Sequence, residues 1–577
     1  MLEKCVANIR YKPAKQIRNT DKKISITTIG IDTEALTTGE CFMACTSLGD
    51  VYDMTNFPDC FFTRKYRNSV FVAYNLKYDS GAFVQHIPLD KLKQLQLDGT
   101  TEHDGFRYKS IGYKCLSISR GKNAIHMYDM LNFYNTSLNV ASKKYLGKQK
   151  LDIDTYEFTP EYVKENWDML ADYCIQDAKL VQELSQILIE RFEGFGVYPR
   201  KLYSVAYIAW QYFSKNAPWI HVKGLWQQNK RILDYAMQSY NGGKFEVTTK
   251  GIDYYYEYDI VSQYPNEIRN LVDLRKAKIL RSRDYQKESI YAFINCTMRI
   301  PISVHSPLAM KNGNLNYYPR GIIKKIITKT EYDYLTSQGC DSVIHDAYWF
   351  LIDDISYPYR TVIDNLMKYK DEYKRTGDKL NYHTVKILMN SFYGKLCQLI
   401  DKKDYWQAGS SWNPIYASVI TANARVSITK MQQDFSCVVA VHTDSIITTQ
   451  ELGFPKVGSI GDMIKEVEGK GIILGSGIYQ IGDKTKFRGF TTKEKLLDLL
   501  PEYGNKLYID KKKPITWKEA AHRGLSNDMI NRFIDIKKAL DLNFDRKRMW
   551  VDDYVSFEEV RERPVFSAPF ILGEHDY

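Results

Sequence analysis

Cysteines in metal-binding or disulfide spacing are absent from this sequence. Its 577 residues include ten cysteines, spread from Cys5 to Cys437, and no two of them form a Cys-x-x-Cys pair. Cys41 and Cys45 are the closest two, and no nearby histidine or cysteine completes a zinc ligand set. The sequence therefore predicts reduced, mostly buried thiols in a reducing compartment.

Long hydrophobic runs and targeting signals are also missing. No apolar run approaches the roughly 20 residues that a membrane-spanning helix needs. Residues 1–15 carry charges without an apolar centre, which is not the pattern of a secretory signal. The sequence has no internal repeat and no low-complexity segment. We therefore expect no membrane partner and a location in the cytoplasm, in the host cytoplasm if the protein is viral, or in the nucleus if the host is a eukaryote. We also expect a monomer.

The chain does have enough apolar material for several cores, and it has an excess of positive charge. Hydrophobic residues make up 44% and aromatic residues 14% of the sequence, which predicts folded structure over most of its length. At roughly 100–200 residues per domain, the length suggests about three to five domains. The net charge of +11 suits a polyanion such as nucleic acid, although many basic proteins bind none.

The order of predicted elements indicates an α/β unit followed by a second unit. Apolar runs at 24–31 and 69–75 predict strands, and a periodic stretch at 160–192, capped by Thr159, predicts one long helix. The residues from 305 to 332, rich in Pro, Asn, Gly and Lys, predict a mostly irregular insertion. Further predictions are strands at 254–260, 437–442 and 445–449, and an antiparallel helix pair at 363–373 and 380–396.

A first set of carboxylates falls in the α/β unit. Asp32 and Glu34 are two apart at a strand end and face the same side. Asp79 follows the second strand, and Asp177 lies on the long helix with Tyr173 one turn before it. Each piece alone is usually a chance occurrence. Together they predict two Mg²⁺ ions for phosphodiester hydrolysis, because converging carboxylates need cations to stay ionised, and Tyr173 is a candidate to orient the attacking water.

A second set of carboxylates falls in the second unit. Asp259 follows the aromatic strand, and Asp444 lies at the tip of the predicted hairpin. Nucleotide addition needs two metals on opposed carboxylates, one for the primer hydroxyl and one for the triphosphate. Ser262 and the turn around it offer donors to phosphate oxygens. Tyr264 would lie beneath the incoming sugar and exclude a 2′-OH by clash.

The predicted helix pair adds a polar face to this second site. Lys386, Asn390 and Tyr393 fall at i, i+4 and i+7 and therefore share one side of a helix. Lys386 is a point charge for a triphosphate, and the other two offer a polar and a stacking surface for a base pair. Lys374 and Arg375, at the end of the paired helix, are candidates to add positive charge there.

In order and wording, these motifs resemble those of the family B DNA polymerases. Within residues 28–190, Asp-x-Glu, Asn-x-x-x-Asp and Tyr-x-x-x-Asp resemble the three exonuclease motifs of a DnaQ-like proofreading domain. The sequences that start at Asp259, Lys386 and His442 resemble polymerase motifs A, B and C. The resemblance implies an α/β, RNase H-like exonuclease domain and an α+β right-hand polymerase with palm, fingers and thumb.

Site roles carried over by position follow from this resemblance. It implies two Mg²⁺ ions in each active site, with Mn²⁺ as a possible substitute. Asn75 and Tyr78 would contact the frayed DNA strand, and Lys150 would assist at the scissile phosphate, although an ordinary solvated lysine fits equally well. The implied metal ligands are Asp32, Glu34, Asp79, Asp177, Asp259, Ile260 and Asp444.

The sequence looks most like the protein-primed replicases of small bacteriophages and linear mobile elements, which start synthesis on a hydroxyl of a terminal protein. Tyr240, Gly242 and Gly243 stand where the family has a Tyr-x-Gly-Gly/Ala element that contacts template backbone; glycines permit that approach, and an ordinary turn is the alternative. The domains predicted are an extension (1–27), the exonuclease (28–195), a linker with the first palm part (196–297), a first insertion (298–355), fingers (356–396), a second palm part with a short second insertion (397–490) and a thumb (491–577).

Three departures from the family pattern bear on activity. Motif C carries His442 where the family usually has Asp, which predicts altered metal or pH behaviour or, less favourably, a silenced polymerase site. The second insertion, between 395 and 413, is short, which puts strong strand displacement and high processivity in doubt. The primer-binding Lys-x-Tyr has only its Tyr479, and Lys484, Lys486 and Arg488 are nearby candidates for the missing lysine. Lys506-Leu-Tyr508 has the full motif further downstream and is the alternative.

The function predicted is a DNA-directed DNA polymerase with a 3′→5′ proofreading exonuclease, using primer-template DNA and dNTPs and primed by a terminal protein. A polymerase that extends a nucleic-acid primer or starts without one is the first alternative. An exonuclease whose polymerase half only binds DNA is the second. A DNA-binding factor without activity would leave six placed carboxylates and Tyr264 without a purpose.

Overall fold

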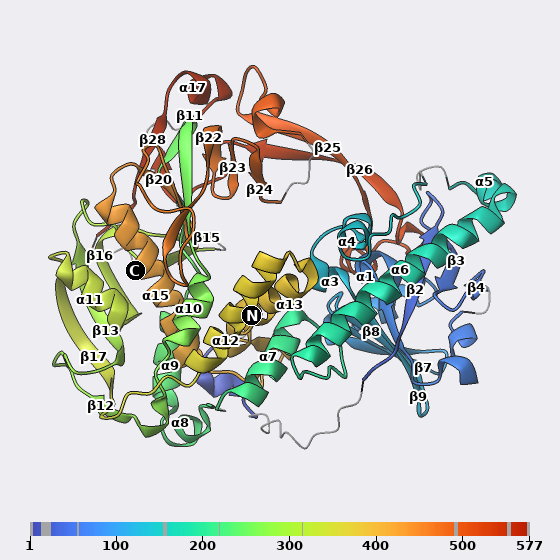
Figure 1. Cartoon of the computed structure of the whole chain (residues 1–577), viewed down its shortest axis with the longest axis horizontal. Helices are drawn as coiled ribbons and strands as arrows, with labels where there is room; N and C mark the ends of the chain where they lie inside the picture. Colours follow the sequence, from blue (N-terminus) through green and yellow to red (C-terminus); the bar gives the residue numbers. More distant parts are fainter. Residues whose placement is uncertain are drawn as a thin grey trace.

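Two halves joined by a two-stranded ribbon make up the molecule. Figure 1 shows the N-terminal half in blue and teal, the larger second half in green, yellow and orange, and the orange ribbon reaching from the second half to the first. The computed structural model describes residues 4–12, 25–54, 57–153, 158–218, 220–313, 315–489, 494–550 and 555–573.

The N-terminal half is built on an eight-stranded sheet in the order β4-β3-β2-β5-β9-β8-β7-β6. β2, β5 and β9 run parallel at its centre, and the remaining neighbours are antiparallel. The strands predicted at the start of the chain are thus confirmed, although the first begins at residue 28. The strands are β2 (Thr28–Ala35), β3 (Cys41–Thr46), β4 (Val51–Tyr52), β5 (Val70–Ala73), β6 (Thr100–His103), β7 (Phe106–Ile111), β8 (Cys115–Arg120) and β9 (Asn123–Asp129).

The prediction of one long helix at 160–192 is wrong in one respect, because the structure divides this stretch into two helices. Thr159 caps the first as expected, with its hydroxyl accepting from the amide of Tyr162. Asn166 then leaves helical geometry and donates its side-chain amide to the Tyr162 carbonyl, a local bond that competes with the helix. The helices of this half are α1 (Leu76–Ala82), α2 (Leu89–Asp98), α3 (Leu131–Tyr134), α4 (Leu138–Tyr145), α5 (Pro160–Glu165) and α6 (Trp167–Gly194).

The second half contains a nine-stranded sheet with the path β10-β20-β21-β11-β22-β23-β24, and β27 and β28 at its side. The predicted aromatic strand and the predicted hairpin are adjacent in it, as β11 and as β20 with β21. Its strands are β10 (Phe245–Val247), β11 (Thr249–Ile260), β20 (Val438–His442), β21 (Ser445–Thr448), β22 (Met463–Gly475), β23 (Ile478–Ile481), β24 (Lys484–Phe487), β27 (Met549–Trp550) and β28 (Val565–Ala568).

A five-stranded sheet corrects the prediction of an irregular insertion. Its order is β12-β17-β13-β16-β29, and apolar side chains of β13, β16 and α11 form its core. The stretch predicted as irregular, 305–332, in fact holds β14, β15, β16 and the start of α11. Pro307, Gly313 and Pro319 lie before or between these strands, so their local frequency hid the ordered segments. The boundary predicted at 297/298 falls inside β13, and the domain limits themselves stay predictions. The elements are β12 (Lys278–Arg281), β13 (Tyr291–Ile300), β14 (Met310–Asn312), β15 (Leu315–Tyr317), β16 (Arg320–Thr328), α11 (Lys329–Ser337), β17 (Asp341–Leu351) and β29 (Ile571–Leu572).

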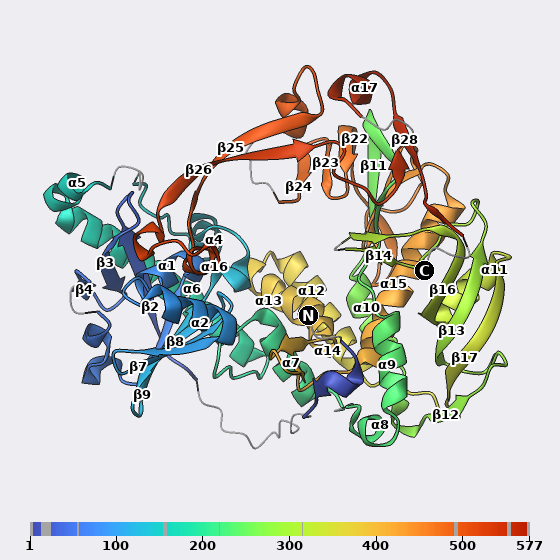
Figure 2. The same cartoon turned by 180° about the vertical axis from the view of Figure 1, so that it is seen from behind.

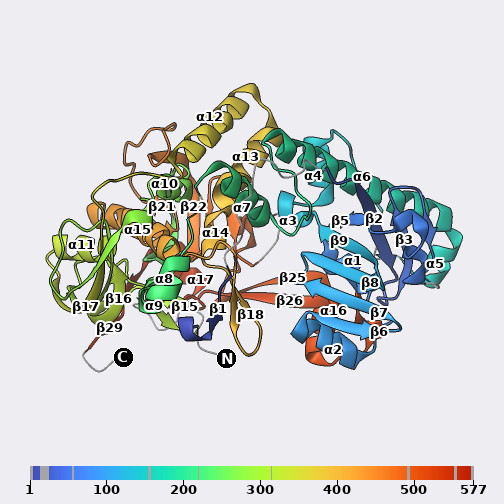
Figure 3. The same cartoon turned by 90° about the horizontal axis from the view of Figure 1, so that it is seen from below.

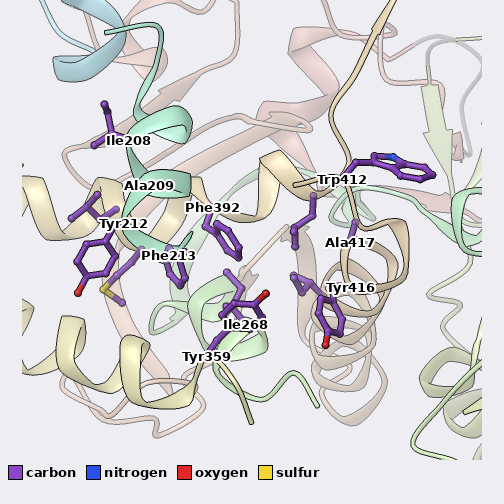
Figure 4. Packing of buried hydrophobic residues seen from close by; sticks show 14 of the residues in the cluster. Ile208, Ala209, Tyr212, Phe213, Ile268, Tyr359, Phe392, Trp412, Tyr416 and Ala417 are labelled. Carbon is purple, nitrogen blue, oxygen red and sulfur yellow. The ribbon is translucent and has the colours of Figure 1, made fainter. Parts of the chain in front are cut away.

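The predicted antiparallel helix pair is confirmed as α12 and α13, although the second helix, predicted at 380–396, is divided at Phe392 into α13 and α14. Helices connect the pair to both halves through one core. Phe213 of α7 stacks on Phe392, with ring centroids 4.2 Å apart, and Tyr359 and Tyr416 pack beside them (Figure 4). The helices are α7 (Val205–Asn216), α8 (Lys223–Gln228), α9 (Lys230–Ser239), α10 (Gln263–Arg269), α12 (Arg360–Thr376), α13 (Lys379–Ser391), α14 (Tyr393–Leu396) and α15 (Pro414–Asp434).

The ribbon consists of β25 (Lys506–Pro514) and β26 (Phe533–Asp541), which pair antiparallel, and it carries α16 (Trp517–Arg523) at its far end. Figures 2 and 3 both place α16 against α2 of the N-terminal half. At the base of the ribbon lies α17 (Phe557–Glu562).

The short segment between motifs B and C forms a hairpin that is held by the start of the chain. β1 (Ile9–Arg10) pairs in parallel with β19 (Trp406–Ala408), and β19 pairs with β18 (Leu399–Asp401). The segment predicted to be a short second insertion is therefore a small hairpin that pairs with β1. Among the helices that the structure describes, none is long and apolar enough to cross a membrane.

Candidate active sites

The first carboxylate set converges as predicted. Asp32 and Glu34 come from β2, and their carboxylate oxygens lie within 4.8 Å of one another and of the Cys174 sulfur on α6. Asp79, from α1, accepts a hydrogen bond of 3.0 Å from the Thr33 hydroxyl, which also belongs to β2. Sequence reasoning missed Cys174, because a cysteine one position after Tyr173 points toward the site only once the helix is docked.

Burial and mutual repulsion perturb these acids strongly. Burial, followed by the charge of Asp177, raises the pKa of Asp32 to about 7. Burial, with neighbouring carboxylates, holds the pKa values of Glu34 and Asp79 well above their ordinary range. Carboxylates that repel one another in this way ionise more readily beside a bound cation. Its oxygen donors suit Mg²⁺, and the Oδ1 atom of Asp177 is buried without a hydrogen-bond partner, as a vacant metal ligand would be.

Lys150 contacts the same cluster directly. Its ammonium forms an ion pair with the buried Asp177 and lies 4.6 Å from the centre of the Tyr173 ring. Although burial works against it, the charges of Asp177 and Asp32 raise the pKa of Lys150, so the ammonium stays protonated. The structure thus assembles Lys150 and Tyr173 with the acids. Their roles in hydrolysis stay predictions.

Asn75 and Tyr78 lie at the start of α1, beside the cluster. Asn75 has the left-handed φ of 77°, and its backbone amide donates to Asp129. Tyr78 is half-buried, and its ring centroid lies 6.2 Å from that of Phe533 in the ribbon. The ribbon therefore reaches the residues predicted to hold a frayed strand.

The second carboxylate set also meets, although its acids are far apart in sequence. Asp259 pairs with Ser445 across β11 and β21, and the amide of Ile260 donates to the Asp444 carbonyl at 2.9 Å. Thr443 takes a φ of 65° in the tight turn that presents Asp444. Burial, followed by the charge of Asp444, raises the pKa of Asp259 to about 7. Burial also raises the pKa of Asp444.

Two further acids beside Asp259 were missed by sequence reasoning. Glu257 is buried two residues before it, and Glu466 lies on the adjacent β22. Lys484 bridges the two, at 2.8 Å from Glu257 and 2.5 Å from Glu466. Strand alternation places Glu257 near the face of Asp259, but it was passed over because no family motif includes it. A cavity of about 610 Å³ is lined by these residues together with Asp259, Asp444, His442, Tyr479 and Lys486.

The side chain of His442 is uncharged in this structure. Burial lowers its pKa to about 3, so its imidazole is neutral. Its ring stacks on Tyr479 at 5.0 Å, and its Nε2 accepts from the Gly477 amide at 3.3 Å. Tyr479 is buried and donates its hydroxyl to Glu257 at 2.8 Å. Tyr479 therefore supports the floor of the site, whereas Lys486 is exposed on its rim.

The helix pair brings lysines to the turn after β11, where the sequence predicts triphosphate binding. Lys370, on α12, donates to the Ser262 hydroxyl at 2.8 Å. Sequence reasoning missed Lys370, although it lies one turn from Lys374. Burial lowers the pKa of Lys370, and the charges of Lys386 and Lys374 lower it further, which places both lysines nearby. Arg375 is exposed at the last turn of α12.

The aromatic residues of motifs A and B stack on one another. Tyr264 and Tyr393 have ring centroids 4.5 Å apart at an angle of 23°. A Cβ atom at Gly243 would lie 2.7 Å from the Thr443 side chain and 3.0 Å from the Tyr264 hydroxyl, so a larger residue there would displace one of these side chains. Asn390 is exposed near the end of α13. Helical periodicity places it on the same side as Tyr393.

Hydrogen bonds from Arg425 and Cys397 fix the rest of the Tyr240–Gly243 loop. The guanidinium of Arg425 donates to the carbonyls of Asn241 and Gly242 at 2.6 and 2.9 Å, and its charge is balanced by Glu331. The Tyr240 hydroxyl accepts from Cys397. A Cβ at Gly242 would meet nothing within 4 Å, so this glycine is open to an approaching backbone.

Comparisons with known proteins agree with this arrangement. Residues 147–411 match the family model described as DNA polymerase type B, organellar and viral. A search of curated proteins finds no match to the chain. The structure of phi29 DNA polymerase complexed with primer-template DNA and incoming nucleotide substrates is similar at a TM-score of 0.64 and 14% identity, over 90% of this chain and 100% of that chain. Its orthorhombic crystal form is similar at a TM-score of 0.63 and 15% identity, over 90% and 100%.

The predicted resemblance is thereby confirmed: residues 147–411 are similar to the type B DNA polymerases of organelles and viruses. The predicted fold class is confirmed too, since the fold over 90% of the chain is that of phi29 DNA polymerase, with exonuclease and polymerase domains.

Proposed function

We propose that the protein is a DNA-directed DNA polymerase that also removes nucleotides from 3′ ends as a proofreading exonuclease. The observation that carries the proposal is the presence of two separate carboxylate clusters, each with its own lysine and tyrosine. Primer-template DNA and dNTPs are the proposed substrates. They are present in the phi29 complex that shares this fold.

Magnesium fits both clusters by the chemistry of the donors. Asp259, Asp444 and Ile260 would hold it in the polymerase site, and Asp32, Glu34, Asp79 and Asp177 in the exonuclease site; Mn²⁺ is a substitute. When bound, such ions lower the pKa of the attacking hydroxyl or water and stabilise the leaving oxygen. The raised pKa values of Asp32 and Asp259 fit acids that ionise on binding a cation.

The chain's own groups position the reactants. In the polymerase site, Lys370, Lys386 and Lys374 attract the triphosphate, and Lys370 is already aligned by Ser262. The Tyr264 ring, fixed by Tyr393, leaves no room for a 2′-OH, which selects deoxynucleotides. In the exonuclease site, Tyr173 orients the attacking water, and Lys150 stabilises charge on the scissile phosphate.

The test is extension and degradation of a labelled recessed primer with Mg²⁺, with and without dNTPs, for the native chain, Asp444→Ala and Asp32→Ala. We expect the first variant to lose only extension and the second to lose only degradation. A native chain that degrades but never extends would overturn the polymerase proposal and favour an exonuclease with a silenced polymerase half. The neutral, inward-stacked His442 supports an intact site, because it adds no charge beside Asp444.

We further propose that synthesis starts on a protein hydroxyl. The support is the family match and the fold shared with phi29 DNA polymerase over 90% of the chain. Incubation with a labelled dNTP, a linear template and candidate proteins encoded beside this gene is the experiment. A labelled, denaturation-resistant protein band is the expected result. Extension of DNA or RNA primers alone, or synthesis without any primer, would replace this proposal by the corresponding alternative.

A further inference from the structure

A cysteine side chain joins the acids of the first carboxylate cluster. The Cys174 sulfur lies within 4.8 Å of a carboxylate oxygen of Asp32 and of one of Glu34, and these two oxygens lie within the same distance of each other. The Cys174 thiol also donates a hydrogen bond to Asp32. Two hard oxygen donors and one soft sulfur donor therefore meet at one point inside the protein.

The close packing of α6 against β2 brings this short side chain to the acids. Figure 3 shows α6 beside β2. Gly30 lies two residues before Asp32 on the same face of the strand, and a Cβ atom there would lie 1.8 Å from the Ala178 carbonyl oxygen. Because the helix backbone rests on the strand at Gly30, a side chain as short as that of Cys174 reaches the acids from one helical turn away.

Two neighbouring cysteines on β3 bond to backbone instead. The Cys41 thiol donates to the Glu34 carbonyl oxygen at 3.1 Å, and the Cys45 thiol donates to the Ala171 carbonyl oxygen at 4.0 Å. Both side chains are buried, as is that of Cys174. Within the part of the chain that the structure describes, Cys174 is the cysteine whose sulfur belongs to a group of possible metal ligands. Burial in the core is therefore common to all three cysteines, but the contact with acids is not.

An oxygen of Asp177 gives a second, independent indication of a cation. Asp177 lies one helical turn after Cys174, is 2% exposed, and is one of the charges that act on Asp32. Its Oδ2 atom forms an ion pair with Lys150. Its Oδ1 atom is buried and has no hydrogen-bond partner among the described residues. A buried oxygen without a donor costs free energy, and a bound cation removes that cost.

We propose that Cys174 is a thiolate ligand of a divalent cation, and that Asp32, Glu34 and Cys174 together hold an ion of the zinc and cadmium class more tightly than magnesium. Zn²⁺ binds cysteine sulfur and carboxylate oxygen with four ligands, whereas Mg²⁺ prefers oxygen in octahedral geometry. Asp177 is the candidate for the fourth ligand. On binding, the thiol proton leaves to solvent and a metal–sulfur bond forms. The inference rests on the proposed function, which places Mg²⁺ at these acids, and adds a sulfur ligand and a cation preference to it.

The second carboxylate cluster offers no such sulfur. The described residues that line the cavity beside Asp259 and Asp444 include acids, lysines and one histidine, and no cysteine. Oxygen donors suit Mg²⁺, and a thiolate selects softer ions. The two sites should therefore differ in the cation that they prefer. Asp259→Ala provides a matched control for this reason, because it removes an acid from the site that lacks a thiol.

The experiment titrates the native chain with Cd²⁺, without DNA, and records the ultraviolet charge-transfer band of a cadmium–thiolate bond. In Cys174→Ser, the Cd²⁺ affinity of this band should fall by at least about tenfold, since losing even an outer partner of a metal site costs that much. Asp32→Asn should weaken it as well. Cys45→Ser removes the neighbouring thiol, and this variant and Asp259→Ala should titrate as the native chain does. A titration that Cys174→Ser leaves unchanged would overturn the proposal.

Magnesium distinguishes a ligand from a packing residue. A serine oxygen is a hard donor, so the rise in Tm that Mg²⁺ causes should be at least as large in Cys174→Ser as in the native chain, whereas the rise that Zn²⁺ causes should shrink. Equal losses for both cations would make Cys174 a packing residue and contradict the proposal. Should the variant fail to fold, crystals of the native chain soaked in Cd²⁺ decide. Anomalous density at bonding distance from the Cys174 sulfur is expected, and density only elsewhere would overturn the proposal.

The binding measurements also keep this proposal separate from the proposed function. A native chain that binds Cd²⁺ through Cys174 but does not degrade a labelled 3′ end in Mg²⁺ would count against the proposed exonuclease and support the metal site. A native chain that degrades DNA in Mg²⁺, with the same Cd²⁺ titration as Cys174→Ser, would support the exonuclease and overturn the metal site.

Discussion

The two carboxylate sites of this chain both bring several acids close together, but they differ in burial and in how lysines balance the negative charge. In the exonuclease site, Asp79 and Asp177 are almost fully buried, and Lys150 forms an ion pair with the cluster itself. In the polymerase site, Asp259 and Asp444 are half-buried beside an open cavity, and the nearest lysines bond to other groups, Lys370 to Ser262 and Lys484 to Glu257.

The difference follows from what each site has to accommodate. A site for hydrolysis of one strand end needs room for a single phosphate, so part of its negative charge can be balanced by a fixed lysine. A site for triphosphate addition has to leave its acids for metal ions and its lysines for phosphate oxygens. In the absence of substrate, more of the negative charge is therefore balanced by the chain's own lysine in the proposed exonuclease site than in the proposed polymerase site.

The largest effect that tests this comparison is expected from Lys150→Met. The change removes the ammonium that neutralises Asp177, so degradation of single strands should fall by about a hundredfold. Extension of a primer with dNTPs should remain within about twofold of native, since the contacts that the structure describes for Lys150, with Asp177 and Tyr173, lie in the N-terminal half. Exonuclease rates on labelled single-stranded DNA measure the first effect, and unchanged degradation would show that Lys150 only fills space.

Lys370→Met is the matched change in the polymerase site. Because Lys370 bonds to Ser262 and to no carboxylate, its loss should weaken nucleotide binding rather than metal binding. We expect the KM for dNTP to rise by about tenfold or more with exonuclease rates preserved. Steady-state extension at several dNTP concentrations is the measurement. A raised Mg²⁺ requirement at an unchanged KM would reverse this assignment of roles.

The dependence on pH should differ between metal-free and metal-bound protein. The folded chain raises the pKa values of Asp32 and Asp259 to about 7, so it holds these protons more tightly than the unfolded chain does. Their contribution to stability is therefore present at low pH and is lost as the pH rises through about 7. Thermal unfolding on either side of that pH should show Mg²⁺ raising Tm more on the alkaline side.

Activity provides the complementary measurement. Below about pH 7 a proton competes with Mg²⁺ at Asp259, so extension should need more Mg²⁺ as the pH falls. The polymerase requirement should change more than that of the exonuclease, in which Lys150 already offsets part of the charge. Identical Mg²⁺ curves for both activities across this range would break the comparison.

The smallest effect is expected from His442→Asp, which restores the usual residue of the family. An aspartate there would place a carboxylate near Asp444, where burial already raises the pKa. Extension should change by less than about tenfold, with a higher Mg²⁺ requirement. His442→Asn is the uncharged control, and equal Mg²⁺ curves for both variants would show that charge at this position has no role.

Local patterns were sufficient to predict much of both sites. Asp32 and Glu34 fall on one side of a strand through the two-residue period, and Lys386 and Asn390 fall on one side of α13 through the 3.6-residue period. Tyr393 begins the next helix, α14, after a break at Phe392 that this period did not predict. Capping chemistry at Thr159 correctly predicted where α5 begins. Composition misled where Pro and Gly separate ordered strands, as between β13 and β16, and the break at Asn166 depends on one local side-chain bond.

Contacts across long stretches of sequence decided the rest. Lys370 was missed because only the docked helix pair brings it to Ser262, and Glu257 because only β22 and β23 supply its partners Lys484 and Tyr479. The short hairpin between motifs B and C is likewise tied down by β1, which comes from the opposite end of the sequence.

The sequence by itself determined the family resemblance, the acids and the order of the elements that carry them, because the motifs are short and depend on local periodicity. Only the tertiary structure decided that His442 is neutral and turned onto Tyr479, that Lys370 bonds to Ser262, and that α16 packs into the core of the N-terminal half. The physical reason is that burial and packing between distant segments set charge state and docking, and no local pattern records which distant surface will cover a residue.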